Sequence, residues 1–366
     1  MCLPDCAAMP SAMAAHNGGD QDQAMTRYIF RRLLILPIVL VGLSVLIFAM
    51  LQLLDPIERA ALYVTSPPKT QSALADIIRK YGLDEPIYLQ YVHWLNRVIH
   101  GDLGWSKTAQ MPVLNALETY FPATLELALW SFIPIIVIGI WLGIQAAIHH
   151  DGIIDQAARV FSIIGYSFPT FVFGLLMLMI FYAALQWLPP GRLSDWATAV
   201  VFAPEFHRYT GLNTVDALLN NRLDVFGDAL RHLLLPALTL AYVNWALILR
   251  VTRSSMLEVI RQDYITVARS KGLRERDVIN RHARPNAMIP VATIGGLLLV
   301  GLLNGAVVTE TVFNYHGMGW WAATSALNFD AVSILGITLF VGALYILANL
   351  AVDVMYAYLD PRIRLA

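Results

Sequence analysis

Six long stretches of apolar residues constrain the fold of this chain more than any other feature. Each contains almost no charged residue, and a helix needs about 20 mostly apolar residues to cross the hydrocarbon core of a bilayer. Charged residues make up 14% of the chain, compared with about 25% in soluble globular domains. The sequence therefore predicts an all-α, polytopic membrane protein with six transmembrane helices, at residues 33–54, 122–148, 160–185, 233–249, 290–308 and 332–358. The fourth stretch is short and would need flanking residues to span the bilayer.

The distribution of Lys and Arg predicts how these helices are oriented. Basic residues concentrate on the cytoplasmic side of membrane proteins, above all in short loops. The segment between the fourth and fifth stretches carries nine of them, whereas residues 309–331 carry none. Three arginines precede the first stretch and two follow the last. We therefore expect both termini to be cytoplasmic, together with the inner loop at about 250–289, and the long loops at about 55–121 and 186–232 to lie outside.

The chain divides into a short extension and one large domain. Residues 1–24 are small and polar, show no apolar period and lack the basic start and apolar core of a signal peptide. They are expected to be a disordered N-terminal extension, followed by a transmembrane domain at 25–366 that opens with "MTRYIFRRLL". The only cysteines, Cys2 and Cys6, lie in the extension, so a disulfide framework or a cysteine metal site is not expected in the domain.

The first outer loop contains one amphipathic segment. "IYLQYVHWLNRVI" at residues 87–99 places its apolar side chains at helical spacing. The pattern predicts a helix that either packs on the outer mouth of the protein or contacts a partner.

The chain lacks the motifs of several enzyme classes. No G-x-x-x-x-G-K-[ST] loop for ATP, no H-E-x-x-H pair for zinc and no G-x-S-x-G nucleophile turn is present. His149, His150 and Asp151 adjoin one another between the second and third stretches. This short cluster is read as a solvated turn, with a metal site as the alternative.

Ionisable residues inside the predicted spans are scarce. Ion-coupled carriers and proton pumps place such residues deep in the membrane, but here Glu126 and Asp353 lie near span ends and Glu310 lies just beyond the fifth. The scarcity argues against a self-sufficient carrier or a membrane enzyme. Asn244, Asn304 and Glu310 are candidates for lining a pathway, and each has a structural role, such as hydrogen bonding between helices, as the alternative.

A basic segment interrupts the apolar sequence between the fourth and fifth stretches. In "DYITVARSKG", Asp263 lies near the start of a predicted helix, where an acid favours the helix dipole. Gly272 is placed to end that helix in the left-handed conformation, and a second helix is expected at about 274–283. The geometry suits docking into a groove of a soluble partner, whereas the charge alone would also suit a topology signal that binds anionic lipid.

The same segment resembles the cytoplasmic signature of ABC importer permeases, which runs Glu-Ala-Ala, three residues, Gly, nine residues, Ile, any residue, Leu-Pro. Ala268, Gly272 and Pro285 match the second alanine, the glycine and the proline. Thr266 and Val267 replace Glu-Ala, and His282 and Arg284 replace Ile and Leu. These departures are typical of the peptide permeases.

The resemblance extends over most of the chain from Met25. "YGLDEPIYLQYVHWL", "GDLGWS", "PATLELAL" and "GAVVTETVFNYHGMG" are similar to segments of the first permease subunit of dipeptide and oligopeptide importers. The resemblance implies the type I ABC importer permease fold and a place in a bacterial or archaeal cytoplasmic membrane. Di- and oligopeptides are the implied cargo, with nickel, glutathione or sugars as alternatives within the family.

The resemblance also implies partners. These are a second homologous permease, two ABC ATPase subunits that hold ATP and Mg, an extracytoplasmic solute-binding protein and membrane lipid, but no nucleic acid. The chain itself would carry no catalytic residue, cofactor or metal. Coupling to the ATPases is assigned by resemblance to twelve residues of the basic segment: Asp263, Tyr264, Thr266, Val267, Ala268, Arg269, Lys271, Gly272, Leu273, His282, Pro285 and Asn286.

Overall fold

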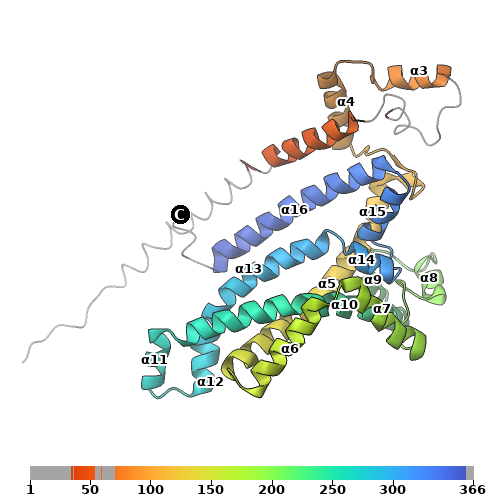
Figure 1. The fold of residues 1–366 in the computed structure, drawn as a ribbon. Helices are drawn as coiled ribbons and strands as arrows, with labels where there is room; N and C mark the ends of the chain where they lie inside the picture. The colour runs from red at the N-terminus through yellow and green to blue at the C-terminus, as the bar shows by residue number, and fades with distance from the viewer. Residues whose placement is uncertain (1–33, 36, 54–58, 60–70, 360–366) are drawn as a thin grey trace, which may run out of the picture.

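The computed structural model describes residues 34–35, 37–53, 59 and 71–359. These residues form long helices that run side by side, with short helices gathered at both ends of the bundle (Figure 1). Helices α11 (Asp263–Ser270) and α12 (Glu275–Asp277) lie at one end, and α8 (Asp195–Val201), α14 (Val307–Val312) and α15 (Met318–Leu327) lie at the other. The expected N-terminal extension at 1–24 lies outside the described residues.

Four helices in the described part are long and apolar enough to cross a membrane, and a bent pair could provide a fifth crossing. The four correspond to the predicted second, fourth, fifth and sixth spans. They are α5 (Val113–Ile148), α10 (Leu223–Ile260), the run Glu275–Leu303 that ends in α13 (Arg284–Leu303), and α16 (Ala331–Leu359).

Several of these helices extend well beyond the apolar stretches that predicted them. Helix α10 has 38 residues and therefore supplies the flanking residues that the short fourth stretch needs. At about 1.5 Å per residue, it is longer than the hydrocarbon core is thick. The predicted outer loop therefore ends before Leu223 rather than at 232. The predicted inner loop at 250–289 is mostly helical.

The third predicted span is not one straight helix. It is divided into α6 (Ile153–Ser167) and a second arm made of α7 (Thr170–Met177) and the π-helix η1 (Leu178–Ala184), bent by 101°. The prediction of a single uninterrupted span at 160–185 was wrong because Pro169 follows Phe168. Proline disfavours the helical conformation of the residue before it, and Phe168 is extended, with φ −84° and ψ 127°.

The first predicted span is described only in part, as the apolar helix Pro37–Leu51. It packs against α16, where a Cβ on Gly342 would lie 2.3 Å from Cδ2 of Leu43. At its outer end the Phe48 ring lies 5.3 Å from the ring of Tyr91 in α4 (Ile87–Ile99). Helix α4 confirms the amphipathic helix predicted in the outer loop, and this contact favours its role as a packing helix.

The fifth span ends earlier than predicted. Helix α13 stops at Leu303, not at 308, and α14 (Val307–Val312) starts after a sharp break. Gly305 takes φ +97° there, and an added Cβ would lie 3.1 Å from the backbone nitrogen of Gly319. The chain then turns back through α15 (Met318–Leu327). Glycine is required at this break because both its backbone conformation and the close approach exclude a side chain.

Several short elements lie in the two long loops that the sequence predicted to be outside. The first loop holds α3 (Gln71–Lys80) and an antiparallel pair of two-residue strands, β1 (Trp105–Ser106) and β2 (Met111–Pro112). The second loop holds α8 (Asp195–Val201) and α9 (Asn213–Leu219).

Helices α5 and α10 form the centre of the bundle. Glycines of α5 let the two backbones approach closely, because a Cβ on Gly143 would lie 2.5 Å from Cβ of Thr252, and one on Gly139 would lie 2.8 Å from Cβ of Ile248. Small residues are a common means of close helix packing in membranes. The two helices therefore form a rigid frame on which both ends of the protein are built.

Candidate functional site

The basic segment forms a short helix, α11 (Asp263–Ser270), that lies across the end of α10 (Figure 1). Asp263 occupies its first turn, as predicted. Gly272 follows its end with φ +76° and donates its N–H to the carbonyl oxygen of Arg269 at 2.9 Å. The predicted helix and its glycine stop are both confirmed.

One side of α11 is buried against the bundle. Ile265 is completely buried and Ala268 is 6% exposed, and their spacing of three residues puts both on one face. They belong to what we call the inner cluster, which joins α11 to α5, α10, η2 (Val278–Ala283) and α13. Its buried members are Ala147, Met256, Ile265, Ala268, Val278, Ile279, Ala283 and Ala287.

The rest of α11 and the residue after its glycine stop are exposed and partly apolar. Tyr264, Val267 and Leu273 are 44%, 52% and 42% exposed. The polar members of the predicted set beside them are exposed as well: Asp263, Thr266, Arg269 and Lys271. Exposed apolar side chains that lie together on a polar surface are typical of interaction sites.

An ion pair braces the turn after α11. The Arg269 guanidinium donates to both carboxylate oxygens of Glu275, at 2.7 and 3.2 Å. This hydrogen bond is the main reason that the pKa of Arg269 is raised. Because both side chains are largely exposed, the pair orders the turn more than it stabilises the fold.

The last three residues of the predicted coupling set lie beyond α11. His282 is half-buried in η2, and Pro285 and Asn286 are exposed in the first turn of α13. Asn286 donates from Nδ2 to the carbonyl oxygen of His282 at 2.9 Å. The structure therefore separates the predicted set into an exposed surface on α11 and a second group where α13 begins.

The three pathway candidates lie on or next to different helices. Asn244 lies in the middle of α10 and donates from Nδ2 to its own helix, at the carbonyl oxygen of Leu240, 2.7 Å away. Asn304 follows the end of α13, and its Oδ1 is buried without a hydrogen-bond partner among the described residues. Glu310 lies in α14, beyond the same break.

Glu310 is completely buried and joins the elements at the end of the bundle opposite α11 (Figure 1). Its Oε1 accepts from Oγ1 of Thr124 at 2.9 Å and from the N–H of Ala306 at 3.3 Å, and its Oε2 accepts from the N–H of Trp320 at 2.8 Å. Burial raises the pKa of the Glu310 carboxyl, although these hydrogen bonds oppose that effect. The contacts join α5, α14 and α15 and favour the structural role for Glu310.

A second buried carboxylate joins the same end to the outer loops. Glu126 in α5 accepts from the N–H and Oγ1 of Thr214 at 2.6 and 2.8 Å, from the hydroxyl of Tyr315 at 3.1 Å and from Arg192 at 3.2 Å. Its partners lie 66 to 189 positions away in the chain. No local pattern in the sequence could have found them.

The structural role of Glu310 gives a prediction. Glu310→Ala leaves the hydroxyl of Thr124 and two N–H groups without their acceptor, and each buried group left unsatisfied costs about 1–3 kcal/mol. We expect a clearly lower unfolding temperature in detergent, whereas the exposed Glu258→Ala should leave it unchanged. If Glu310 instead lines the pathway, Glu310→Gln should keep a normal unfolding temperature and lower the uptake per folded molecule.

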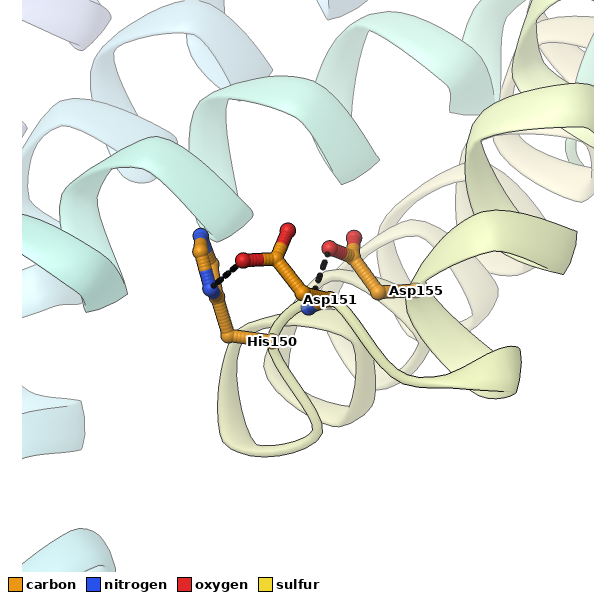
Figure 2. A group of neighbouring side chains, drawn as sticks. All are labelled: His150, Asp151 and Asp155. Atoms are coloured by element: carbon orange, nitrogen blue, oxygen red, sulfur yellow. Dashed lines mark hydrogen bonds and ion pairs between the residues drawn. The ribbon is translucent and has the colours of Figure 1, made fainter.

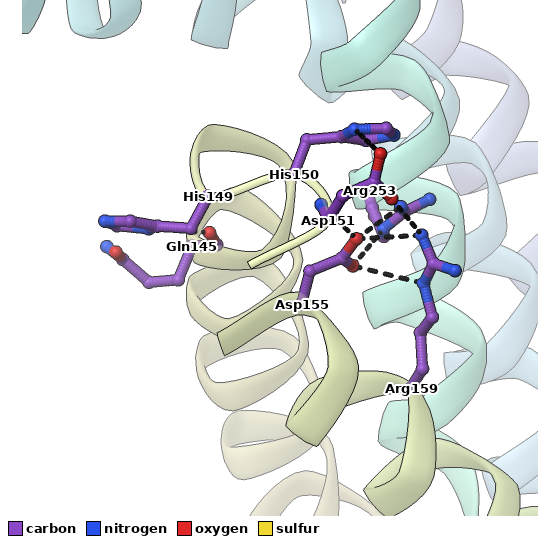
Figure 3. A network of polar contacts seen from close by, with 7 residues as sticks. All are labelled: Gln145, His149, His150, Asp151, Asp155, Arg159 and Arg253. Atoms are coloured by element: carbon purple, nitrogen blue, oxygen red, sulfur yellow. Dashed lines mark hydrogen bonds and ion pairs between the residues drawn. The ribbon is translucent and has the colours of Figure 1, made fainter. Parts of the chain in front are cut away.

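The residues between α5 and α6 form the cluster that raised the question of a metal site. His150, Asp151 and Asp155 approach within 4.8 Å of one another (Figure 2). His149, which the sequence placed with them, points away and contacts the carbonyl oxygen of Gln145 in its own helix (Figure 3).

Two arginines already occupy the central carboxylate of this cluster. Asp155 is fully buried and accepts from Arg253 at 2.6 and 2.8 Å, from Arg159 at 2.8 and 3.3 Å and from the N–H of Asp151 at 3.0 Å (Figure 3). A cation would have to displace these guanidinium groups and would be repelled by them. The geometry therefore favours an ion-pair network over a metal site.

Comparison with known proteins places the chain among transport permeases. Residues 135–365 match the model of the family described as "Binding-protein-dependent transport system inner membrane component", and residues 25–128 match the N-terminal component model of the same systems.

Individual relatives cover almost the whole chain. The probable D,D-dipeptide transport system permease protein DdpB of Escherichia coli (strain K12) is 41% identical over 90% of this chain and 94% of its own. The dipeptide transport system permease protein DppB of the same strain is 38% identical, over 93% and 99%. The oligopeptide transport system permease protein AppB of Bacillus subtilis (strain 168) is 35% identical, also over 93% and 99%.

Proposed function

Because this chain belongs to the family of inner membrane components of binding-protein-dependent transport systems, we propose that it is the permease subunit of an ATP-driven importer of di- and oligopeptides. The relatives named above are described as dipeptide or oligopeptide permeases, and their similarity to this chain covers nearly their full length. The chain is a multi-pass membrane protein that transports rather than catalyses, and its family works with a solute-binding protein and with ATPases.

The observation that carries this proposal is the construction of α11. Ile265 and Ala268 fix the helix to the ends of α5, α10 and α13, and Tyr264, Val267 and Leu273 are left exposed. A helix that is packed on the bundle on one side and exposes both apolar and polar side chains elsewhere suits docking into a groove of an ATPase subunit. Movement of the ATPases would then displace α10 and α13 together with α11.

The topology that we propose has six spans, with both termini and α11 on the cytoplasmic side of a bacterial or archaeal membrane. The inner segment at 250–289 carries nine basic residues, which supports this orientation. The permease domain would occupy 25–366. The outer helices α8, α9, α14 and α15 would then face the solute-binding protein.

The complex that we propose contains this chain, a second homologous permease, two ATPase subunits that bind ATP and Mg, and the solute-binding protein. The translocation pathway would lie between the two permeases. The cargo is selected largely by the binding protein, so nickel, glutathione and sugars are alternative outcomes of a cargo test, which would measure ligand binding by that protein.

Reconstitution tests the proposed function. The chain is expressed with a second permease, two ATPase subunits and a solute-binding protein of a peptide importer, and uptake of a labelled dipeptide into proteoliposomes is measured. We expect uptake that requires ATP and stops when either the ATPases or the binding protein is omitted. Uptake by this chain alone, without ATP, would show that it is a self-sufficient carrier.

We also propose that residues 1–24 are dispensable. The match to the N-terminal family model begins at residue 25, where the sequence offers another methionine. A chain that starts at Met25 is expected to insert into the membrane and to support uptake at the full-length rate. Loss of insertion or of uptake in that shortened chain, measured in the same vesicles, would contradict this.

A further inference from the structure

The ion pair between Asp155 and Arg253 connects two helices that are far apart in the sequence. Asp155 lies in the first turn of α6, and Arg253 lies in α10. Nε and Nη2 of Arg253 each donate to a different oxygen of the carboxylate, at 2.6 and 2.8 Å. Such two-point contacts fix orientation as well as distance. Arg159, the other basic partner, belongs to α6 itself, so it cannot join α6 to α10.

Arg253 occupies a particular place along α10. Its neighbour Thr252 packs on Gly143 of α5, and Met256, three residues further on, is a buried member of the inner cluster that holds α11. Three residues of helix span about 4.5 Å. The ion pair is therefore attached to the rigid part of α10 that α11 packs against.

Asp155 in turn is attached to the broken span. Helix α6 leads through the bend at Pro169 into α7, and Gly174 of α7 packs on Phe313, beside α14 at the outer end, where an added Cβ would lie 3.1 Å from the ring. Apolar contacts also line α6 and α10, among them Phe161 against Trp245 at 5.3 Å between ring centroids. Apolar contacts specify the relative position of two helices less sharply than a two-point ion pair does.

We propose that Asp155 and Arg253 are positioning residues for transport, which make α6 and α7 move with α10 when α11 is displaced by the ATPases. The inference rests on the proposed function. It adds a specific role for a buried charge pair that lies outside the coupling segment. Without the pair, α10 would still move with α11, but α6 and α7 would no longer keep a fixed position relative to α10.

The test measures the number of dipeptides transported per ATP hydrolysed in the reconstituted complex. Arg253→Ala should leave ATP hydrolysis stimulated by the binding protein and lower this ratio by at least about fivefold, the low end of coupling between distant sites. Arg222→Ala is the matched control, because Arg222 makes the same two-point contact with Asp224, at 3.0 and 2.7 Å, but at an exposed position within one loop and helix start. Its ratio should not change.

Leaving Asp155 buried without Arg253 is destabilising, so a second variant is included. Arg253→Lys keeps the charge but loses the two-point geometry, and it is measured in the same way if Arg253→Ala fails to assemble. An unchanged ratio in whichever variant assembles would overturn the inference. Only the hydrolysis that the binding protein stimulates is counted, because that hydrolysis requires assembled complex and a mere loss of folded protein then lowers both quantities together.

The experiment separates this inference from the proposed function. If the unaltered complex shows no ATP-dependent uptake, the proposed function fails. If the unaltered complex transports and the Arg253 variant keeps its ratio, only the positioning role fails.

Discussion

Ala268→Trp is expected to abolish peptide uptake and the stimulation of ATP hydrolysis, while the chain still inserts into the membrane. Ala268 is 6% exposed and packs in the inner cluster with Met256 and Ile279. Overfilling a packed core typically costs about 1–3 kcal/mol through displaced backbone and strained side chains. Because this part of the core holds only α11 and the helix ends, the helix should be displaced and the spans should stay in place. Uptake and ATP hydrolysis in reconstituted vesicles measure the effect.

Ala157→Trp provides the control for this variant. Ala157 lies in α6, at the same end of the bundle, and its side chain is exposed. The same added volume should therefore leave uptake unchanged. Normal transport by Ala268→Trp would contradict the claim that α11 must be seated on the inner cluster.

Gly272→Pro is expected to have a comparably large effect for a different reason. Gly272 has φ +76°, which proline cannot adopt because its ring fixes φ near −65°. Proline would also remove the N–H that donates to the carbonyl oxygen of Arg269. The turn between α11 and α12 (Glu275–Asp277) should open, and stimulated ATP hydrolysis and uptake should both be lost with insertion preserved.

Gly272→Asn separates conformation from size at this position. A Cβ at Gly272 would meet no atom within 4 Å, and asparagine enters the left-handed region more readily than other residues with a side chain. We expect this variant to keep most of its uptake. Loss of uptake equal to that of Gly272→Pro would show that the exposed backbone, and not the turn, is what the partner requires.

The sequence predicted the parts of this fold that local patterns determine. The length of the apolar stretches located the long helices. Asp263 at the start and Gly272 after the end located α11, because both signals depend only on residues that are close in the sequence. The break at Phe168–Pro169 was also visible in principle. It was missed because the apolar stretch continues across it. Hydropathy alone does not show that proline restricts the backbone of the preceding residue.

The buried charges could not be predicted from local patterns. Glu310 was named as a pathway candidate because a charged residue near a span suggests transport, yet its acceptor atoms are filled by groups 4 to 186 positions away. Asp155 and Arg253, 98 positions apart, were not paired at all. Tertiary hydrogen bonding decides whether a charge near the membrane is free or structural, and one sequence does not contain that information.

Photo-cross-linking from Tyr264 tests the central claim most directly. Tyr264 is 44% exposed on the outward face of α11, and a photoreactive phenylalanine there should form an adduct with the ATPase subunit in membranes that hold the assembled complex. Phe329 is an aromatic residue that is 91% exposed at the opposite end of the bundle, and the same label there should give no such adduct. An ATPase adduct from position 264 alone is the result that we predict. Its absence from a complex that transports peptide would contradict the assignment of α11 as the coupling helix.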